Sequence, residues 1–259
     1  MELNGVLAPL PTPFTDDGSA ISEIRLLRLL RRLQELGVAG YVACGEVGEF
    51  GALSRPERKQ LVEILLRDPA SSLQVVVNVS ALSTVASLDL AQHAARHGAR
   101  ACVLMPPFYG SFSQEEHYNY MRVVAQYAGL PVIVVDPNGV LEGELNAQLA
   151  ALPGIFVAAP NFWAARALGG KARSKVDEFS MDPGASTVGA LFRPALRLFQ
   201  LPEEDIQRVT RFIQLHGSAR VAKAAFEIQG IELGPLRGPQ LALRQSAAQE
   251  LQALLGIGD

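Results

Sequence analysis

Three acidic residues that follow predicted β-strands are the first candidates for chemistry in this sequence. Glu46 and Glu49 come just after the apolar run 40–44, and Asp136 comes just after the apolar run 132–135. Parallel strands place their carboxyl ends on one face, where barrel enzymes carry their active sites. An acidic pocket there could bind a cation or an amine, or hold carboxylates with separated pKa values for acid–base work. The structural alternatives are that Glu49 braces its loop and that Asp136 makes a turn.

Nucleophilic amines and metal-binding side chains are few. The chain has only four lysines, so any lysine chemistry has four candidates: Lys59, Lys171, Lys175 and Lys223. The four histidines all fall in helical patterns rather than at strand ends: His93, His97, His117 and His216. They are therefore expected to serve as helix-face residues, and the sequence predicts neither a metal site nor a cofactor.

The composition excludes several classes of function. The chain has 259 residues, of which 49% are hydrophobic and 19% charged, with a net charge of −3. Without a basic run there is little basis for nucleic-acid binding. Cys44 and Cys102 lie in apolar runs and are predicted to be core residues rather than a disulfide or metal pair. No signal peptide and no apolar run of about 18 residues is evident, so a cytoplasmic protein without membrane contact is expected.

Short apolar runs alternate with amphipathic stretches along the first 160 residues, which is typical of a parallel sheet with crossover helices. Capping boxes at Ser54 and Ser113 and a stop at Gly98 mark helix ends. The predicted strands are 5–10, 40–44, 73–78, 101–105, 132–135 and 155–158. The length suits one (β/α)8 TIM barrel, which needs about 250 residues.

The regular alternation is lost after Asn161. Residues 176–181 and 185–190 are candidates for the seventh and eighth strands, and the seventh unit is expected to be truncated. Helical patterns return at 203–216, 219–229 and 246–255. The sequence thus predicts an α/β barrel over residues 1–200 and a C-terminal helical extension, 201–259, packed on it.

Four stretches of the chain resemble the dihydrodipicolinate synthase and N-acetylneuraminate lyase family, the pyruvate-dependent class I aldolases. They are residues 5–14 with Asp17 and Gly18, 45–49 with 53–58, 105–109 with 113–115, and 221–225 with 234–239. The resemblance implies a lyase in which a lysine amine forms a Schiff base with pyruvate. It also implies a tyrosine that transfers protons, a threonine loop that binds the substrate carboxylate, and a homodimer or homotetramer.

Most of the family's reactive positions hold other residue types here. The lysine position falls at Ala159, the proton-transferring tyrosine at Val135, and the two loop threonines at Glu46 and Val47. An arginine position falls near Val140. Alanine cannot form an imine, valine cannot transfer a proton, and a carboxylate repels the carboxylate of pyruvate.

Other positions of the resembled site are kept. Gly45 and Gly48 persist in the loop, and Tyr109 persists as a candidate catalytic residue or as a packing residue at a subunit contact. The candidate substrate-binding set is Gly45, Glu46, Val47, Gly48, Asp136 and Ala159. Phe162 and Trp163 follow Ala159 and either fill the vacated pocket or line one for an apolar ligand.

Three hypotheses about function follow. The protein is a lyase-family enzyme with altered, lysine-free chemistry. Alternatively, it is a catalytically inactive homologue that binds a small metabolite, such as a keto acid, or regulates a partner. In the third hypothesis another lysine, such as Lys175, restores the pyruvate-dependent aldolase activity.

Overall fold

The computed structural model describes residue 3 and residues 7–35, 38–67, 73–107, 109–157 and 203–255. The chain divides into two compact units. Unit 1 comprises Met1–Gly5 and Arg58–Asp182, and unit 2 comprises Val6–Glu57 and Pro183–Asp259. The chain passes from unit 2 into unit 1 within helix α2 (Arg55–Leu65).

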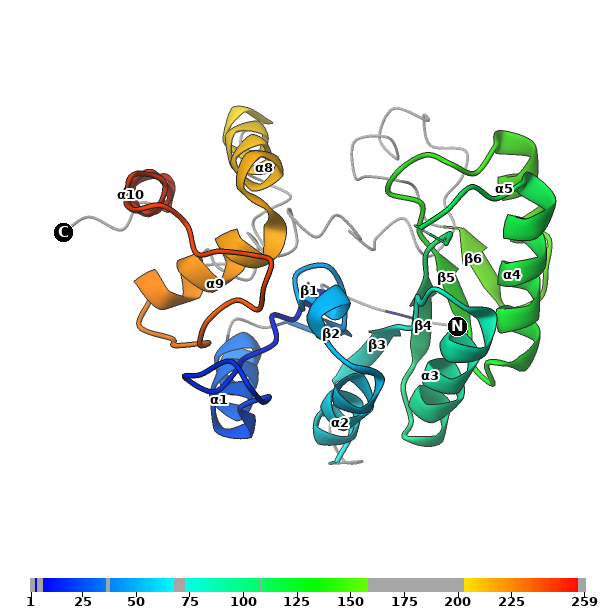
Figure 1. The fold of residues 1–259 in the computed structure, drawn as a ribbon, viewed down its shortest axis with the longest axis horizontal. Coiled ribbons are helices and arrows are strands. Elements are labelled where there is room, and N and C mark those ends of the chain that lie inside the picture. The colour runs from blue at the N-terminus through cyan, green and yellow to red at the C-terminus, as the bar shows by residue number, and fades with distance from the viewer. Residues whose placement is uncertain are drawn as a thin grey trace. The chain divides into compact units, whose positions relative to one another are not determined.

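Unit 1 is built on four parallel strands that follow one another in the sheet in chain order (Figure 1). They are β3 (Gln74–Asn78), β4 (Ala101–Leu104), β5 (Val132–Val134) and β6 (Ile155–Val157). β4 and β5 are buried along their whole length. Strands covered on both faces are continuous apolar runs, which is why the sequence of unit 1 shows no alternation in these segments.

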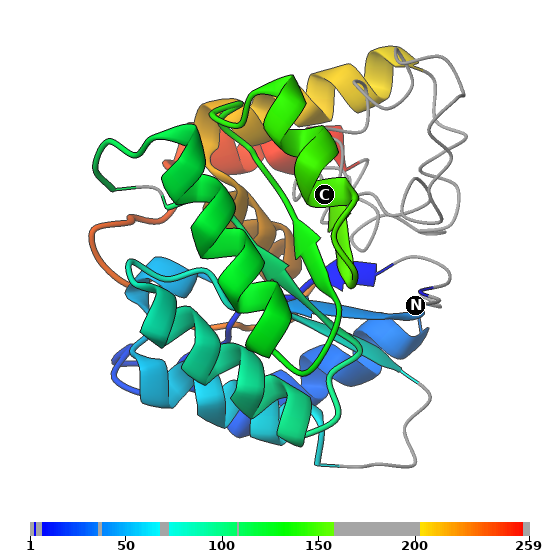
Figure 2. The same ribbon diagram turned by 90° about the vertical axis from the view of Figure 1, so that its right-hand side faces the viewer.

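The helices of unit 1 alternate with its strands. They are α3 (Thr84–Arg96), α4 (Gln114–Tyr127) and α5 (Gly143–Ala150), and Figure 2 shows them side by side in front of the strands. The Ser113 side chain accepts a hydrogen bond from the Glu116 backbone, and the Glu116 carboxylate accepts one from the Ser113 backbone. This capping box satisfies donors that the first turn of α4 leaves free.

Unit 2 pairs two short parallel strands, β1 (Leu7–Pro9) and β2 (Gly40–Ala43), with Ala8 opposite Tyr41. Its helices are α1 (Glu23–Glu35), the 3-10 turn η1 (Phe50–Ala52), α8 (Glu203–His216), α9 (Ser218–Ile228) and α10 (Gln245–Leu254). α1 buries Leu26, Leu29 and Leu33 on one face, as helical spacing requires.

The structure confirms the predicted α/β class and places all six described strands inside the predicted ranges. The helices predicted at 203–216, 219–229 and 246–255 are also present, the last two shifted by one residue. α5 and η1 were not predicted. The candidate strands 176–181 and 185–190 lie outside the described residues, and the division at residue 200 stays a prediction. No described helix is long and apolar enough to span a membrane.

Candidate functional site

The loop that follows β2 in unit 2 holds four of the predicted site residues in a tight turn. Backbone hydrogen bonds run from Glu49 N–H to the Glu46 carbonyl (3.0 Å) and from Phe50 N–H to the Gly45 carbonyl (3.2 Å). Cys44 (φ 55°) and Glu49 (φ 56°) flank the turn in the left-handed region. That region is uncommon for residues other than glycine, and such strained conformations cluster at functional sites.

The middle of this loop carries one carboxylate and one apolar side chain. Glu46 is exposed, and its Oε1 accepts a hydrogen bond from Ser218 Oγ at 2.8 Å. Val47 is buried, with 1% of its surface exposed. The loop therefore offers a negative charge to solvent, and Val47 offers no hydrogen-bonding side chain to a ligand.

Gly48 is required by close packing of unit 2. A Cβ atom at this position would lie 2.8 Å from the Leu10 carbonyl oxygen and 3.3 Å from Thr12 Oγ1. Thr12 Oγ1 also donates a 2.7 Å hydrogen bond to the Gly48 carbonyl. A Cβ at Gly45 would meet no atom within 4 Å.

We therefore expect Gly48→Ala to lower the free energy of unfolding by about 1–3 kcal/mol, because overpacking forces the backbone to shift. Gly45→Ala is the matched control from the same loop and should change that free energy by less than about 0.5 kcal/mol. Urea denaturation of both variants checks this expectation. Equal effects of the two substitutions would contradict the close approach of Gly48 to Leu10.

Glu49 is the centre of a buried charge cluster in unit 2. Its Oε1 lies 2.6 Å from Lys223 Nζ, and its Oε2 accepts a 2.8 Å hydrogen bond from the Arg237 backbone. Lys223 Nζ also donates to the Pro235 carbonyl at 2.7 Å. The Lys223 ammonium and the Arg237 guanidinium both lie over the Phe14 ring, at 4.2 and 4.1 Å from its centroid. Glu49 thus braces its loop, which was the structural alternative.

Arg237 ties the same cluster to neighbouring backbone. Its guanidinium lies 2.7 Å from Glu57 Oε1 and donates to the carbonyls of Gly18, Ser19 and Ala52. These bonds satisfy a nearly full set of guanidinium donors, which favours a fixed orientation.

The strand ends of unit 1 hold three further predicted residues. Val135 is buried and its N–H bonds to the Leu104 carbonyl at 3.1 Å, so its side chain stands directly after β5. Asp136 is also buried, and its Oδ2 accepts the Leu141 N–H at 2.8 Å. Its Oδ1 has no hydrogen-bond partner among the described residues. Tyr109, after β4, is 79% exposed.

A polar network connects the ends of β3 and β4 in unit 1. Arg58 is buried and donates to the carbonyls of Asn78 (2.6 Å) and Ser80 (2.9 Å). Ser80 Oγ donates to Asn78 Oδ1 at 2.6 Å and accepts the Met105 N–H at 2.8 Å. The network thus ties Met105, directly after β4, to the end of β3.

Comparison with known proteins decides the family. The model of the dihydrodipicolinate synthetase family matches residues 2–155, more than half of the chain. The chain belongs to the dihydrodipicolinate synthetase family. The 4-hydroxy-tetrahydrodipicolinate synthase of Bartonella quintana is 34% identical over 137 residues, 53% of this chain and 46% of that protein. The N-acetylneuraminate lyase of Escherichia coli is 34% identical over 158 residues, 59% and 53% of the two chains. These matches thus span about half the length of the curated relatives.

Solved structures of the dihydrodipicolinate synthetase family share the fold over nearly the whole chain. A putative dihydrodipicolinate synthetase from Pseudomonas aeruginosa has a TM-score of 0.80 and 23% identity over 99% of both chains. Dihydrodipicolinate synthase from Acinetobacter baumannii, complexed with pyruvate, has a TM-score of 0.78 and 20% identity over 97% of both chains. A catalytic lysine mutant of Ruminococcus gnavus sialic acid aldolase scores 0.77 at 18% identity, over 99% of this chain and 98% of that one.

The structure brings some predicted site residues of this family member together and leaves others untested. Gly45, Glu46, Val47 and Gly48 form one loop of unit 2, whereas Val135, Asp136 and Tyr109 lie in unit 1. A common acidic pocket of Glu46 and Asp136 therefore stays a prediction. Ala159, Phe162, Trp163 and Lys175 lie outside the described residues.

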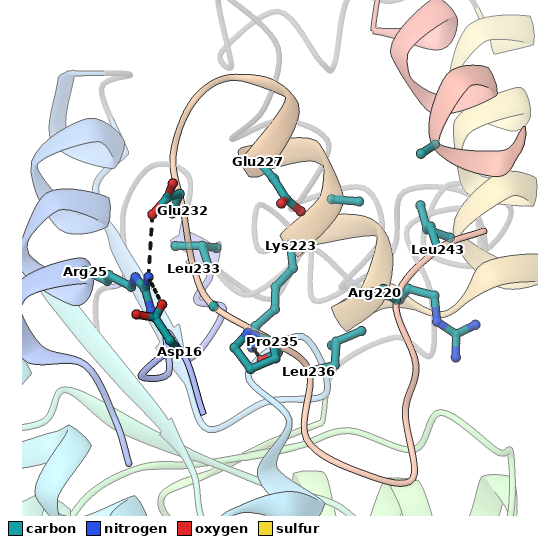
Figure 3. A pocket seen from close by; sticks show the side chains of 14 residues that line it. Asp16, Arg25, Arg220, Lys223, Glu227, Glu232, Leu233, Pro235, Leu236 and Leu243 are labelled. Atoms are coloured by element: carbon teal, nitrogen blue, oxygen red, sulfur yellow. Dashed lines mark hydrogen bonds and ion pairs between the residues drawn. The ribbon is translucent and has the colours of Figure 1, made fainter. Parts of the chain in front are cut away.

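Unit 2 also contains a pocket of about 450 Å³, which the sequence did not predict (Figure 3). Arg25 stands at one side, where it pairs with Asp16 (2.5 Å) and Glu232 (3.5 Å). Lys223 extends from α9 toward Pro235. Other polar side chains of the lining are Arg220 and Glu227. The residues that line this pocket lie up to 232 positions apart in the chain, from Asp16 to Ala248, so no local pattern could have revealed them.

Proposed function

We propose that this protein is a diverged member of the dihydrodipicolinate synthetase family that does not form a Schiff base with pyruvate. The residue that supports the proposal most is Val135, at the position where the resemblance predicts the proton-transferring tyrosine. It is buried at the end of β5 and has no group that can accept or donate a proton. Even if an imine formed at this site, no tyrosine at position 135 would be present to transfer protons to or from it.

The loop after β2 supports the same proposal. A pyruvate carboxylate bound there would meet the exposed Glu46 carboxylate, where the resembled enzymes supply neutral hydroxyl donors. Like charges at close range cost free energy. Val47 is buried and offers only apolar surface. The site is therefore unsuited to a keto acid bound through its carboxylate in the family's manner.

The lysines that the structure describes do not replace the missing amine. Lys223 Nζ lies 2.6 Å from Glu49 Oε1, and Lys59 Nζ lies 2.7 Å from Asp89 Oδ1. An ammonium held by a carboxylate has no free electron pair for attack on a ketone. Burial lowers the pKa of Lys223, and hydrogen bonding and charge from Glu49 act in the opposite direction. Rescue by Lys175 remains the alternative within the family chemistry.

Proton exchange on pyruvate tests the proposal. A Schiff base makes the methyl protons of pyruvate acidic, so an enzyme that forms it exchanges them for deuterium in D₂O. We expect proton NMR to show no exchange above the rate of pyruvate in D₂O without protein. An E. coli N-acetylneuraminate lyase sample serves as the positive control. Saturable, enzyme-dependent exchange by the wild-type protein would refute the proposal.

The pocket in unit 2 favours a second function, reversible binding of a small metabolite without chemistry. Its volume of about 450 Å³ is that of a metabolite site, and cationic and anionic side chains both line it. A saturable rise of the melting temperature with a keto acid or amino acid, without proton exchange, would support this function. Assembly as a homodimer or homotetramer belongs to the proposal through the family resemblance, and a cytoplasmic location belongs to it through the sequence pattern.

A further inference from the structure

Helix α3 and the part of α2 that belongs to unit 1 bring a carboxylate and two imidazoles together. Glu63 stands on α2, His93 stands on α3, and His97 is the C-cap residue of α3. One potential ligand atom from each residue lies within 4.8 Å of the other two. The Glu63 Oε1 to His93 Nε2 distance is 3.2 Å.

The two histidines converge because they are four residues apart on one helix, a spacing that places side chains on the same face. Their ring centroids are 4.2 Å apart. His97 Nδ1 lies 2.9 Å from the His93 carbonyl oxygen, which can only accept a hydrogen bond. That contact fixes the proton of a neutral His97 on Nδ1 and leaves the electron pair on Nε2, the arrangement that metal-bound histidines commonly show.

His93 is the anchor of the cluster. It is 7% exposed, and its Nε2 atom lacks a hydrogen bond with suitable geometry despite being buried. A buried polar atom without a hydrogen bond calls for a specific explanation, such as an ion. Burial lowers the pKa of His93, the neighbouring His97 lowers it further, and Glu63 acts in the opposite direction.

The surrounding charge permits a cation. The charge of Lys59, one turn before Glu63 on α2, also lowers the pKa of His93, and Lys59 is paired with Asp89 at 2.7 Å. Glu63 and His97 are exposed, so both can rotate toward an ion without repacking the core. Ligand atoms around zinc lie about 3.3 Å apart at the usual bond lengths, so only these two side chains need to move.

We propose that Glu63, His93 and His97 form a binding site for a divalent transition metal of the zinc class. Two nitrogens and one carboxylate oxygen suit zinc, nickel or copper rather than magnesium or calcium, which prefer oxygen ligands. Three protein ligands leave a fourth position for water or for a residue from another molecule. The ion links α2 to α3 and thereby stabilises the helical layer of unit 1. The site is independent of the proposed function, and it replaces the expectation that these histidines are only helix-face residues.

Metal titration of the full-length protein tests the proposal. After removal of metals by a chelator, Zn²⁺ is titrated by calorimetry, and Co²⁺ is titrated by visible absorption, which reports imidazole ligation. We expect one tight equivalent in the wild-type protein and at least a tenfold loss of affinity in both His97→Ala and Glu63→Gln, whose side chains are exposed. His216→Ala removes a histidine from α8 in unit 2 and should leave the affinity unchanged.

A second readout separates the site from incidental binding elsewhere. Zn²⁺ should raise the melting temperature of the wild-type protein and of His216→Ala, because an ion that binds the native state stabilises it. It should not do so in His97→Ala. The proposal is overturned if the wild-type protein fails to bind Zn²⁺, or if His97→Ala binds it with wild-type affinity.

Discussion

Replacing Lys223 by methionine is expected to lower the free energy of unfolding by about 3–5 kcal/mol, the usual cost of removing one partner of a buried ion pair. Lys223 and Glu49 are 5% and 2% exposed, so the remaining carboxylate of Glu49 cannot recover hydration. Methionine keeps most of the aliphatic length of lysine, so the loss reflects charge rather than an empty cavity. Guanidinium denaturation measures the change.

Lys59→Met is the matched control for this prediction. The Lys59–Asp89 ion pair, at 2.7 Å, is nearly as short as the Lys223–Glu49 pair, at 2.6 Å. The side chains of Lys59 and Asp89, however, are both partly exposed. Such pairs contribute at most about 1 kcal/mol. The double variant Lys223→Met with Glu49→Gln should recover part of the loss, because the orphaned charge is gone. A Lys223→Met variant as stable as Lys59→Met would show that the buried pair does not hold the loop.

The strands and most helices could be predicted because their signals are local. Apolar runs such as 132–135 and caps such as Ser83 and Ser113 specify elements within a few residues of themselves. Helix α5 was missed because it has only 8 residues, begins at a glycine and has no side-chain cap at Glu142. The 3-10 turn η1 was missed because three residues carry no periodicity.

The contacts of the candidate site could be predicted only in part. The residue types of the loop and of the end of β5 are read directly from the sequence, and the resemblance predicts which family positions Val47 and Val135 hold. The ion pair of Glu49 with Lys223 spans 174 positions, and that of Glu63 with His93 joins two helices. Such pairs depend on tertiary packing, and only the spacing of His93 and His97 gave a sequence signal for the metal site.

The second large effect is expected from a covalent trap. A protein that forms a Schiff base with pyruvate becomes irreversibly labelled when borohydride reduces the imine to a secondary amine. A family member with its reactive lysine should be labelled almost completely. The resemblance predicts the lysine position at Ala159, and the described lysines, Lys59 and Lys223, are both ion-paired. We therefore expect this protein to carry no label, whereas the family member with the lysine is labelled almost completely.

The measurement that tests the account most directly is the intact mass of the protein after incubation with pyruvate and borohydride. Escherichia coli N-acetylneuraminate lyase treated in parallel shows that the reagents act. The predicted result is an unchanged mass beside a labelled control. That result would direct the search for ligands to the loop after β2, which carries Glu46, and to the pocket of unit 2. A pyruvate-dependent adduct on Lys171, Lys175 or any other lysine would contradict the account, because it would show that the imine chemistry has moved rather than disappeared.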